Sequence, residues 1–264
     1  EKFFDRVNHD VLMARVAREV QDANVLRLIR RFLQAAMMAN GVETPRYEGT
    51  PQGGPLSPLL SNILLTDLDR ELEKRQLLFC RYADDCNIYV GSQRAGQRIM
   101  QSVKGFLANR LKLTVNEAKS AVARPSMRKF LGYSLWVVKG KVVQLTVAKK
   151  ALLTFKQRIR ELTWRSGGRS MAEVVERLRV YLLGWKTYFA LAPAIKVRRE
   201  LDEWLRHRLR AIQLKHWKRG KTMFRELRAL GASVDVAKQV AANSRRWWRN
   251  SARLVQTTLT ISHF

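Results

Sequence analysis

Two hydrophobic periodicities alternate along the first half of the chain. Apolar residues recur every three to four positions in several segments, which is the spacing of helices that bury one face. These segments are 9–20, 24–38 and 55–75. Residues 78–82 and 86–90 are short apolar runs and predict two strands. The stretch 41–54 is rich in Gly, Pro and polar residues, so we predict turns and a short hairpin there.

The pattern becomes almost entirely helical further along. We predict a helix at about 94–110, a strand at 111–115 and a hairpin made of 129–138 and 141–147. The following segments, up to about 258, have helical spacing. In one of them Ser170 is a plausible N-cap with Glu173 three residues on. In the long basic helix the apolar stripe consists of Leu201, Leu205, Leu209 and Ile212.

Charge divides the chain at about the same place as the periodicity. Residues 1–146 hold 23 basic and 14 acidic residues, a net charge of +9, whereas 147–264 hold 27 and 8, a net charge of +19. We therefore predict a mixed domain at 1–146 and a helical, strongly basic domain at 147–264.

Composition narrows the classes of partner. The net charge of +28 and the isoelectric point near 11.1 attract a polyanion, for which nucleic acid is favoured over an anionic membrane surface. No apolar run reaches the ~18 residues that span a bilayer, and we recognise no signal peptide. Cys80 and Cys86 are too few for a disulfide framework, which indicates a reducing cytosol and a cytoplasmic protein.

Two adjacent carboxylates, Asp84 and Asp85, lie between the strands predicted at 78–82 and 86–90. At about 4 Å and an effective dielectric of about 20, their repulsion is roughly 4 kcal/mol. An Asp pair is also common in ordinary turns, since Asp favours them. Apolar runs on both sides, however, bring this turn to the edge of a sheet, where Mg²⁺ suits two carboxylates together with substrate phosphates. A magnesium site is therefore one prediction for the pair.

Five motifs in order give a resemblance to reverse transcriptases. Tyr82-Ala83-Asp84-Asp85 matches the metal-binding motif of that family. The other matching segments are 2–13, 48–65, 111–120 and 129–134. Beyond them, segments within 160–231 resemble the thumb and maturase domain of bacterial group II intron-encoded proteins. The implied fold is α+β, a right-hand polymerase palm with a split βαβ antiparallel sheet, followed by an all-helical thumb/maturase domain.

The resemblance implies two Mg²⁺ ions bound by three aspartates. Asp84 would be the principal ligand and Asp85 a secondary one. By the spacing of the motif, the third aspartate falls two positions before Glu1, and Asp5 has the wrong offset to replace it. We therefore expect this chain to be a fragment that lacks the fingers and one metal ligand, and to polymerise little by itself.

Further residues match family positions that contact substrate. Phe4 would exclude a ribose 2′-hydroxyl, Gln52 and Gly53 would bind the deoxynucleoside triphosphate, and Lys119 would act as a general acid toward pyrophosphate. The primer grip would be Leu131, Gly132 and Tyr133. Each has a simpler alternative: a core aromatic for Phe4, a Pro-Gly turn for Gln52 and Gly53, a surface lysine for Lys119 and a hairpin edge for the grip.

The basic helical half is expected to contact RNA. Its excess charge needs counter-charge, and phosphates supply it, although a solvated helix face is the simpler alternative for any one helix. The candidate RNA-binding residues are Arg206, Arg210, Lys218, Arg245 and Arg246. The resemblance names intron RNA and an RNA/DNA duplex as partners and leaves the oligomeric state open.

The function that the resemblance implies is RNA-directed DNA polymerisation by two-Mg²⁺ nucleotidyl transfer, with maturase activity in RNA splicing and a role in intron mobility. Two alternatives remain open. One is a non-catalytic RNA-binding maturase that keeps the palm as a scaffold. The other is a reverse transcriptase of the retron or defence type, which shares the aspartate pair.

Overall fold

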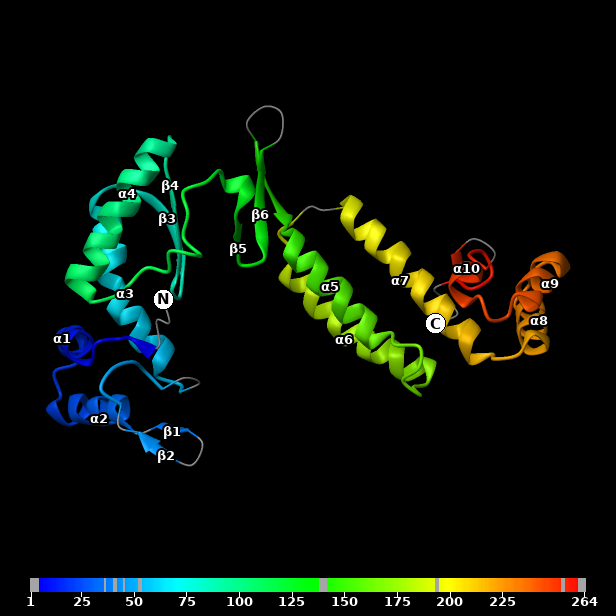
Figure 1. Ribbon diagram of the computed structural model, residues 1–264, viewed down its shortest axis with the longest axis horizontal. Helices are drawn as coiled ribbons and strands as arrows, with labels where there is room; N and C mark the ends of the chain where they lie inside the picture. The colour runs from blue at the N-terminus through cyan, green and yellow to red at the C-terminus, as the bar shows by residue number, and fades with distance from the viewer. Residues whose placement is uncertain are drawn as a thin grey trace. The chain divides into compact units, whose positions relative to one another are not determined.

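The computed structural model of the chain divides into two compact units, Glu1–Arg124 and Pro125–Phe264. It describes residues 5–35, 37–39, 42–44, 46–51, 54–137, 142–192, 195–252 and 255–260, with only the backbone at 37–39, 42–44 and 196. This division is one of packing alone, and the functional boundary near 146 stays a prediction. Figure 1 labels most of the helices and strands of both units.

The first unit combines helices with two small antiparallel hairpins. Its described helices are α1 (His9–Glu19), α2 (Ala23–Gln34), α3 (Ser57–Lys74) and α4 (Gln93–Phe106), with a π-helical turn at Leu107–Leu111. The hairpins are β1 (Met37–Ala39) with β2 (Val42–Thr44), and β3 (Leu78–Tyr82) with β4 (Asp85–Tyr89).

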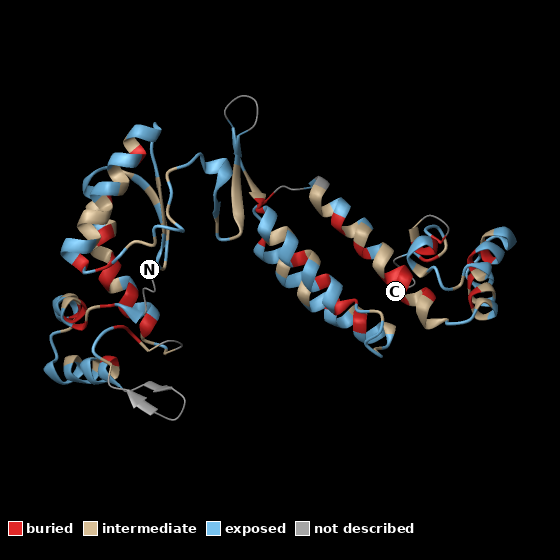
Figure 2. Cartoon of the chain, in the orientation of Figure 1, coloured by how far each residue is buried: buried red, intermediate tan, exposed pale blue. Residues whose placement is uncertain are grey.

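Helix α3 is the centre of the first unit's core. Pro58 lies in its first turn, where a missing N–H costs nothing. Leucines four residues apart then face inward, and none is more than 4% exposed. They are Leu60, Leu64, Leu68 and Leu72. Phe79 of β3 and Ile88 of β4 pack against this core, so the second hairpin rests on α3. Figure 2 shows the buried positions of α3 in red.

The second unit opens with a three-stranded antiparallel sheet in the order β5-β6-β7. The strands are β5 (Lys129–Phe130), β6 (Tyr133–Val137) and β7 (Val143–Val147). Phe130 pairs with Tyr133, so Leu131 and Gly132 alone form the first turn. Both have positive φ, at 50° and 78°, which is the pattern of a type I′ hairpin.

The regular elements described after this sheet are all helices. They are α5 (Lys149–Leu162), α6 (Met171–Tyr188), α7 (Ile195–His216), α8 (Gly220–Ala229), α9 (Val234–Ala242) and α10 (Trp247–Ala252). The predicted stripe of α7 is confirmed, because Leu201, Leu205, Leu209 and Ile212 are all buried against α5 and α6. The Ser170 cap is confirmed too, since its side chain accepts from the Glu173 N–H. A separate cluster joins α8 to α9.

The α+β class is confirmed, and three local predictions are wrong. Residues 111–115 form no strand: Leu111 ends the π-helical turn, and both it and Leu113 are buried in the core. The helix predicted at 24–38 ends at Gln34, since Met37 begins β1. The strand predicted at 129–138 is broken by the turn at Leu131 and Gly132.

None of the helices in the described ranges is long and apolar enough to cross a membrane.

Candidate active site

The Asp84–Asp85 pair lies at the tip of the β3–β4 hairpin. Tyr82 pairs with Asp85, so Ala83 and Asp84 are the two turn residues and Asp85 begins β4. Ala83 has a positive φ of 51°, whereas the φ of Asp84 is not positive. Positive φ at the first central residue alone is the pattern of a type II′ turn, where Gly is usual. An alanine in this conformation is strained by about 1–2 kcal/mol.

Arg81 anchors this turn to α3. Its Nε and Nη2 donate to the two carboxylate oxygens of Asp69 at 2.7 and 2.5 Å. Its Nη1 donates to Oδ1 of Asn62 at 3.1 Å and to the Ala83 carbonyl at 2.9 Å. The hydrogen bonds to Asp69 raise the pKa of the Arg81 guanidinium above its ordinary value, although burial opposes them. The pair therefore stays charged and bonded.

The two turn carboxylates have the chemistry of a cation site. Asp84 and Asp85 are exposed, and among the described residues neither forms an ion pair. The nearby Asp67 and Asp69 on α3 are both paired with arginines. Free adjacent carboxylates fit one Mg²⁺ that also binds phosphate oxygens and water. In the part of the chain that the structure describes, no third His, Cys, Asp or Glu joins them, so a second ion needs further ligands.

The loop before α3 is fixed on both flanks of the predicted nucleotide motif. Nε2 of the buried His9 lies 2.7 Å from the Gly49 carbonyl, and the Gly49 N–H donates to the Val7 carbonyl at 2.7 Å. On the other side, the Ser57 hydroxyl donates to the Pro51 carbonyl at 2.5 Å. A Cβ at Gly54 would meet Phe32 at 2.9 Å. This backbone is thus closely packed where the motif begins and ends.

Three predicted substrate residues lie outside the described residues. They are Phe4, Gln52 and Gly53. Lys119 is exposed and lies in a turn. Its backbone N–H donates to the carbonyl and to the side-chain oxygen of Asn116. The roles of all four stay predictions.

The predicted primer grip forms a fixed turn within the second unit. The Tyr188 hydroxyl donates to the Leu131 carbonyl at 3.0 Å, and the Tyr133 hydroxyl donates to the Tyr188 carbonyl. A Cβ at Gly132 would meet the Phe189 ring at 3.1 Å, so this glycine allows close packing as well as positive φ. The turn is therefore held by α6 rather than by its own strands alone.

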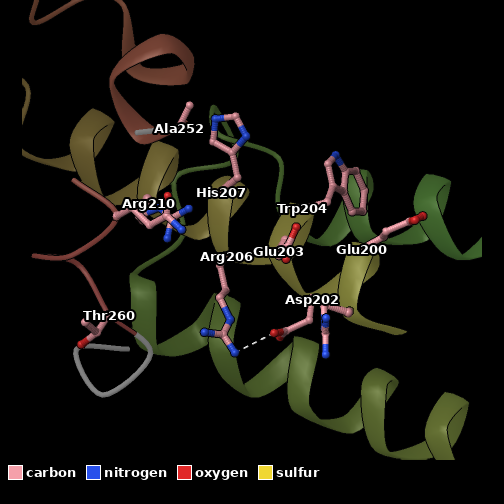
Figure 3. Close-up of a pocket in the computed structure, with 11 residues that line it drawn as sticks. Glu200, Asp202, Glu203, Trp204, Arg206, His207, Arg210, Ala252 and Thr260 are labelled. Atoms are coloured by element: carbon pink, nitrogen blue, oxygen red, sulfur yellow. Dashed lines mark ion pairs between the residues drawn. The ribbon is translucent and has the colours of Figure 1, made fainter. Parts of the chain in front are cut away.

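A groove of about 860 Å³ runs along α7 toward α10 and the C-terminal residues (Figure 3). Arg206 on its wall pairs with Asp202 at 2.6 Å. Arg210 is only 6% exposed and donates from Nε to the Ser251 carbonyl at 2.8 Å, which gives it a packing role between helices. Lys218, Arg245 and Arg246 are exposed, and among the described residues they form no ion pair. Their RNA contacts stay predictions.

Aromatic rings and cations from α5, α7 and α10 contact one another around α7. His207 stacks on Trp248 with ring centroids 3.7 Å apart, and burial lowers the pKa of that histidine. Arg160 and Arg208 lie over Trp204 at 5.7 and 5.3 Å. Such a surface of cations and stacking rings suits single-stranded or duplex nucleic acid.

Sequence reasoning missed Arg81 and Arg208. Arg81 could have been found, because strict alternation places it on the face of β3 that packs inward, where an unpaired arginine is costly. Arg208 donates to the Thr163 hydroxyl and to carbonyls at the C-terminus of α5. Burial and the charges of Arg165 and Arg160 lower its pKa to about 10. No spacing rule connects it to residues so far away in sequence.

Comparison with known proteins gives two family matches in sequence order. The model for reverse transcriptase (RNA-dependent DNA polymerase) matches residues 1–135, and that for the group II intron maturase-specific domain matches 152–231. The group II intron-encoded protein LtrA of Lactococcus lactis is 30% identical over 199 residues, with 51% of this chain and 33% of LtrA covered.

Two other relatives are similar. Protein YkfC of Escherichia coli is 30% identical over 154 residues, covering 46% of this chain and 40% of YkfC. A putative COX1/OXI3 intron 1 protein of Saccharomyces cerevisiae is 25% identical over 192 residues, covering 51% and 23%. The chain thus spans 40% or less of the length of these relatives.

Proposed function

Because the chain belongs to the reverse transcriptase family, we propose that it is part of an RNA-directed DNA polymerase of a group II intron that also acts as a maturase. The observation that carries the proposal is the order of the matches: a polymerase family first, then a maturase domain. The free carboxylate pair at a strained turn supports the polymerase half. In this proposal 1–146 is the palm, with a remnant of the fingers, and 147–264 is the thumb and maturase domain.

The proposed chemistry is transfer of a deoxynucleotide to a primer. Divalent ions, when bound, activate the primer 3′-hydroxyl and neutralise the triphosphate. Asp84 in the turn would provide the principal oxygen ligands, and Asp85 at the start of β4 would provide the secondary ones. Lys119 donates a proton to the leaving pyrophosphate, for which an ammonium with three donors is suited.

The remaining residues position the substrates. Gln52 and Gly53 contact the incoming nucleotide, because an amide offers both donor and acceptor and a glycine admits close backbone approach. Phe4 packs against the sugar and excludes a 2′-hydroxyl. Leu131, Gly132 and Tyr133 hold the primer strand.

The basic half is proposed to bind intron RNA and the RNA/DNA duplex, chiefly through phosphates. Its net charge of +19 supports this, as do the exposed side chains of Lys218, Arg245 and Arg246, which form no ion pair with the residues that the structure describes. Arg206 would exchange its bond to Asp202 for a phosphate. Arg210 would contribute mainly by holding α7 against Ser251. We place this activity in the cytoplasm.

Primer extension by the protein produced from its complete gene tests the proposal. Asp84→Asn removes one charge with little change of shape, so extension should be lost while RNA binding persists. The control is Asp10→Asn, since Asp10 is also an exposed aspartate in the first unit, where its loss of charge affects an ion pair with Arg30 at the start of α1. Extension that survives Asp84→Asn would remove the metal assignment, and equal loss in Asp10→Asn would point to general damage.

A further inference from the structure

We propose that Arg81 is a positioning residue for the reaction: it holds the turn that carries Asp84 and Asp85 in the one conformation that aims both carboxylates at the metal–nucleotide complex. The inference rests on the proposed polymerase function. It concerns a residue that touches neither metal nor substrate and acts through the carbonyl of Ala83.

The turn needs such support because its backbone is strained. Ala83 has φ of 51°, and an alanine free to relax prefers negative values. Asp84 follows immediately, so a change of φ at Ala83 swings the Asp84 side chain to a new direction. The strands themselves fix only Tyr82 and Asp85, the residues that close the turn.

The guanidinium of Arg81 supplies this support by joining the turn to α3. Its bond to the Ala83 carbonyl is 2.9 Å long, and three further bonds fasten the same group to α3. Asn62 and Asp69 are seven residues apart, two helical turns, and so share one face of that helix. The carbonyl of the strained residue is therefore tied to the best-buried helix of the unit.

Asp69 makes this arrangement compatible with cation binding. A bare guanidinium beside a carboxylate pair would repel Mg²⁺ and compete for its ligands. The side chains of Arg81 and Asp69 are 12% and 23% exposed and form a bidentate pair, which cancels the charge and leaves only the hydrogen bond to act on the turn. Asp84 and Asp85 stay outside this pair, free to bind metal.

A second ion pair on the same helix provides a matched control. Arg15 pairs with Asp67 at 3.0 Å, and their side chains are 14% and 19% exposed. Its remaining bonds go to the carbonyls of Val11 and Arg110, neither of which belongs to the turn. Losing the three hydrogen bonds of Arg15 weakens packing around α3 and leaves the Ala83 carbonyl bonded to Arg81.

The experiment compares Arg81→Lys with Arg15→Lys in the protein produced from its complete gene. Lysine keeps the charge but cannot form the planar fork that reaches Asp69, Asn62 and Ala83 together. For Arg81→Lys we expect the Mg²⁺ concentration for half-maximal primer extension to rise, and the rate at saturating Mg²⁺ to fall about 10- to 100-fold, as expected for a misplaced catalytic group. Arg15→Lys should lower the melting temperature similarly and leave the Mg²⁺ midpoint unchanged.

A rescue variant separates positioning from stability. Glycine adopts positive φ without strain, so adding Ala83→Gly to Arg81→Lys should lower the Mg²⁺ midpoint back toward that of the unaltered protein. The inference is overturned if Arg81→Lys leaves the midpoint unchanged, if Arg15→Lys moves it equally, or if glycine restores nothing. Failure of the unaltered protein to extend primers would instead overturn the proposed function, and this inference with it.

Discussion

Replacing Gly132 by alanine should destabilise the second unit more than a Gly→Ala change at a turn where the new Cβ meets no neighbouring atoms. Two costs add at this position. Positive φ of 78° costs an alanine about 1–2 kcal/mol. The new Cβ also meets two ring atoms of Phe189 at 3.1 and 3.2 Å. Phe189 is 6% exposed and packs against Tyr133, Tyr188 and Trp185, so it has little room to move. Overpacking of this kind costs about 1–3 kcal/mol.

Two other glycines of the same unit isolate the separate contributions. Gly231 has φ of 85° and nothing within 4 Å of a new Cβ, so Gly231→Ala measures backbone strain alone. Gly184 lies inside α6 with open space around it, and Gly184→Ala should stabilise the helix by about 1 kcal/mol. The predicted cost for Gly132→Ala is therefore about 2–5 kcal/mol, larger than that for Gly231→Ala by the overpacking contribution.

Urea unfolding followed by tryptophan fluorescence measures these differences. All seven tryptophans lie beyond residue 125, so the signal comes from the second unit. The reasoning is refuted if Gly132→Ala costs no more than Gly231→Ala. Adding Phe189→Leu to Gly132→Ala supplies a check, since the smaller side chain should recover part of the overpacking loss.

Two further predictions concern ionisation and capping. Burial raises the pKa of the Cys86 thiol to about 11, so the folded state disfavours the thiolate. The stability that Cys86 contributes should therefore be constant below about pH 8.5, where the thiol is protonated in both states, and should fall as the pH rises toward 11. Comparing Cys86→Ala with the unaltered chain in urea across that range checks this, and parallel pH curves would contradict it. Ser170→Ala should cost about 1 kcal/mol, because the Glu173 N–H loses its acceptor; an unchanged unfolding midpoint would show that water replaces the cap.

Sequence patterns predicted the helices well where burial follows a single periodicity. The stripe from Leu201 to Ile212 and the cap at Ser170 are local features, and both are present. The strand at 78–82 has the predicted bounds, whereas its partner begins at Asp85 rather than 86, since the turn contains only two residues.

Sequence patterns failed to predict the local structure where packing between distant segments determines it. Leu111 and Leu113 alternate as strand residues do, yet they fill the core at and just after the end of a π-helical turn, with no partner strand in the described ranges. The turn at Leu131 and Gly132 interrupts an apolar run whose only local signal was one glycine. Arg81 depends on Asp69 and Asn62, and a contact between a strand and a helix has no fixed spacing in sequence.

The most direct test of the proposed polymerase is a crystal structure of the protein from its complete gene with primer, template, Mg²⁺ and a deoxynucleoside triphosphate. The account predicts an ion with oxygens of Asp84 and of the triphosphate at about 2.0–2.1 Å, and Asp85 close to it. It also predicts that Arg81 still donates to the Ala83 carbonyl. An ion bound away from the Asp84–Asp85 turn, or a nucleotide that does not reach it, would contradict the account.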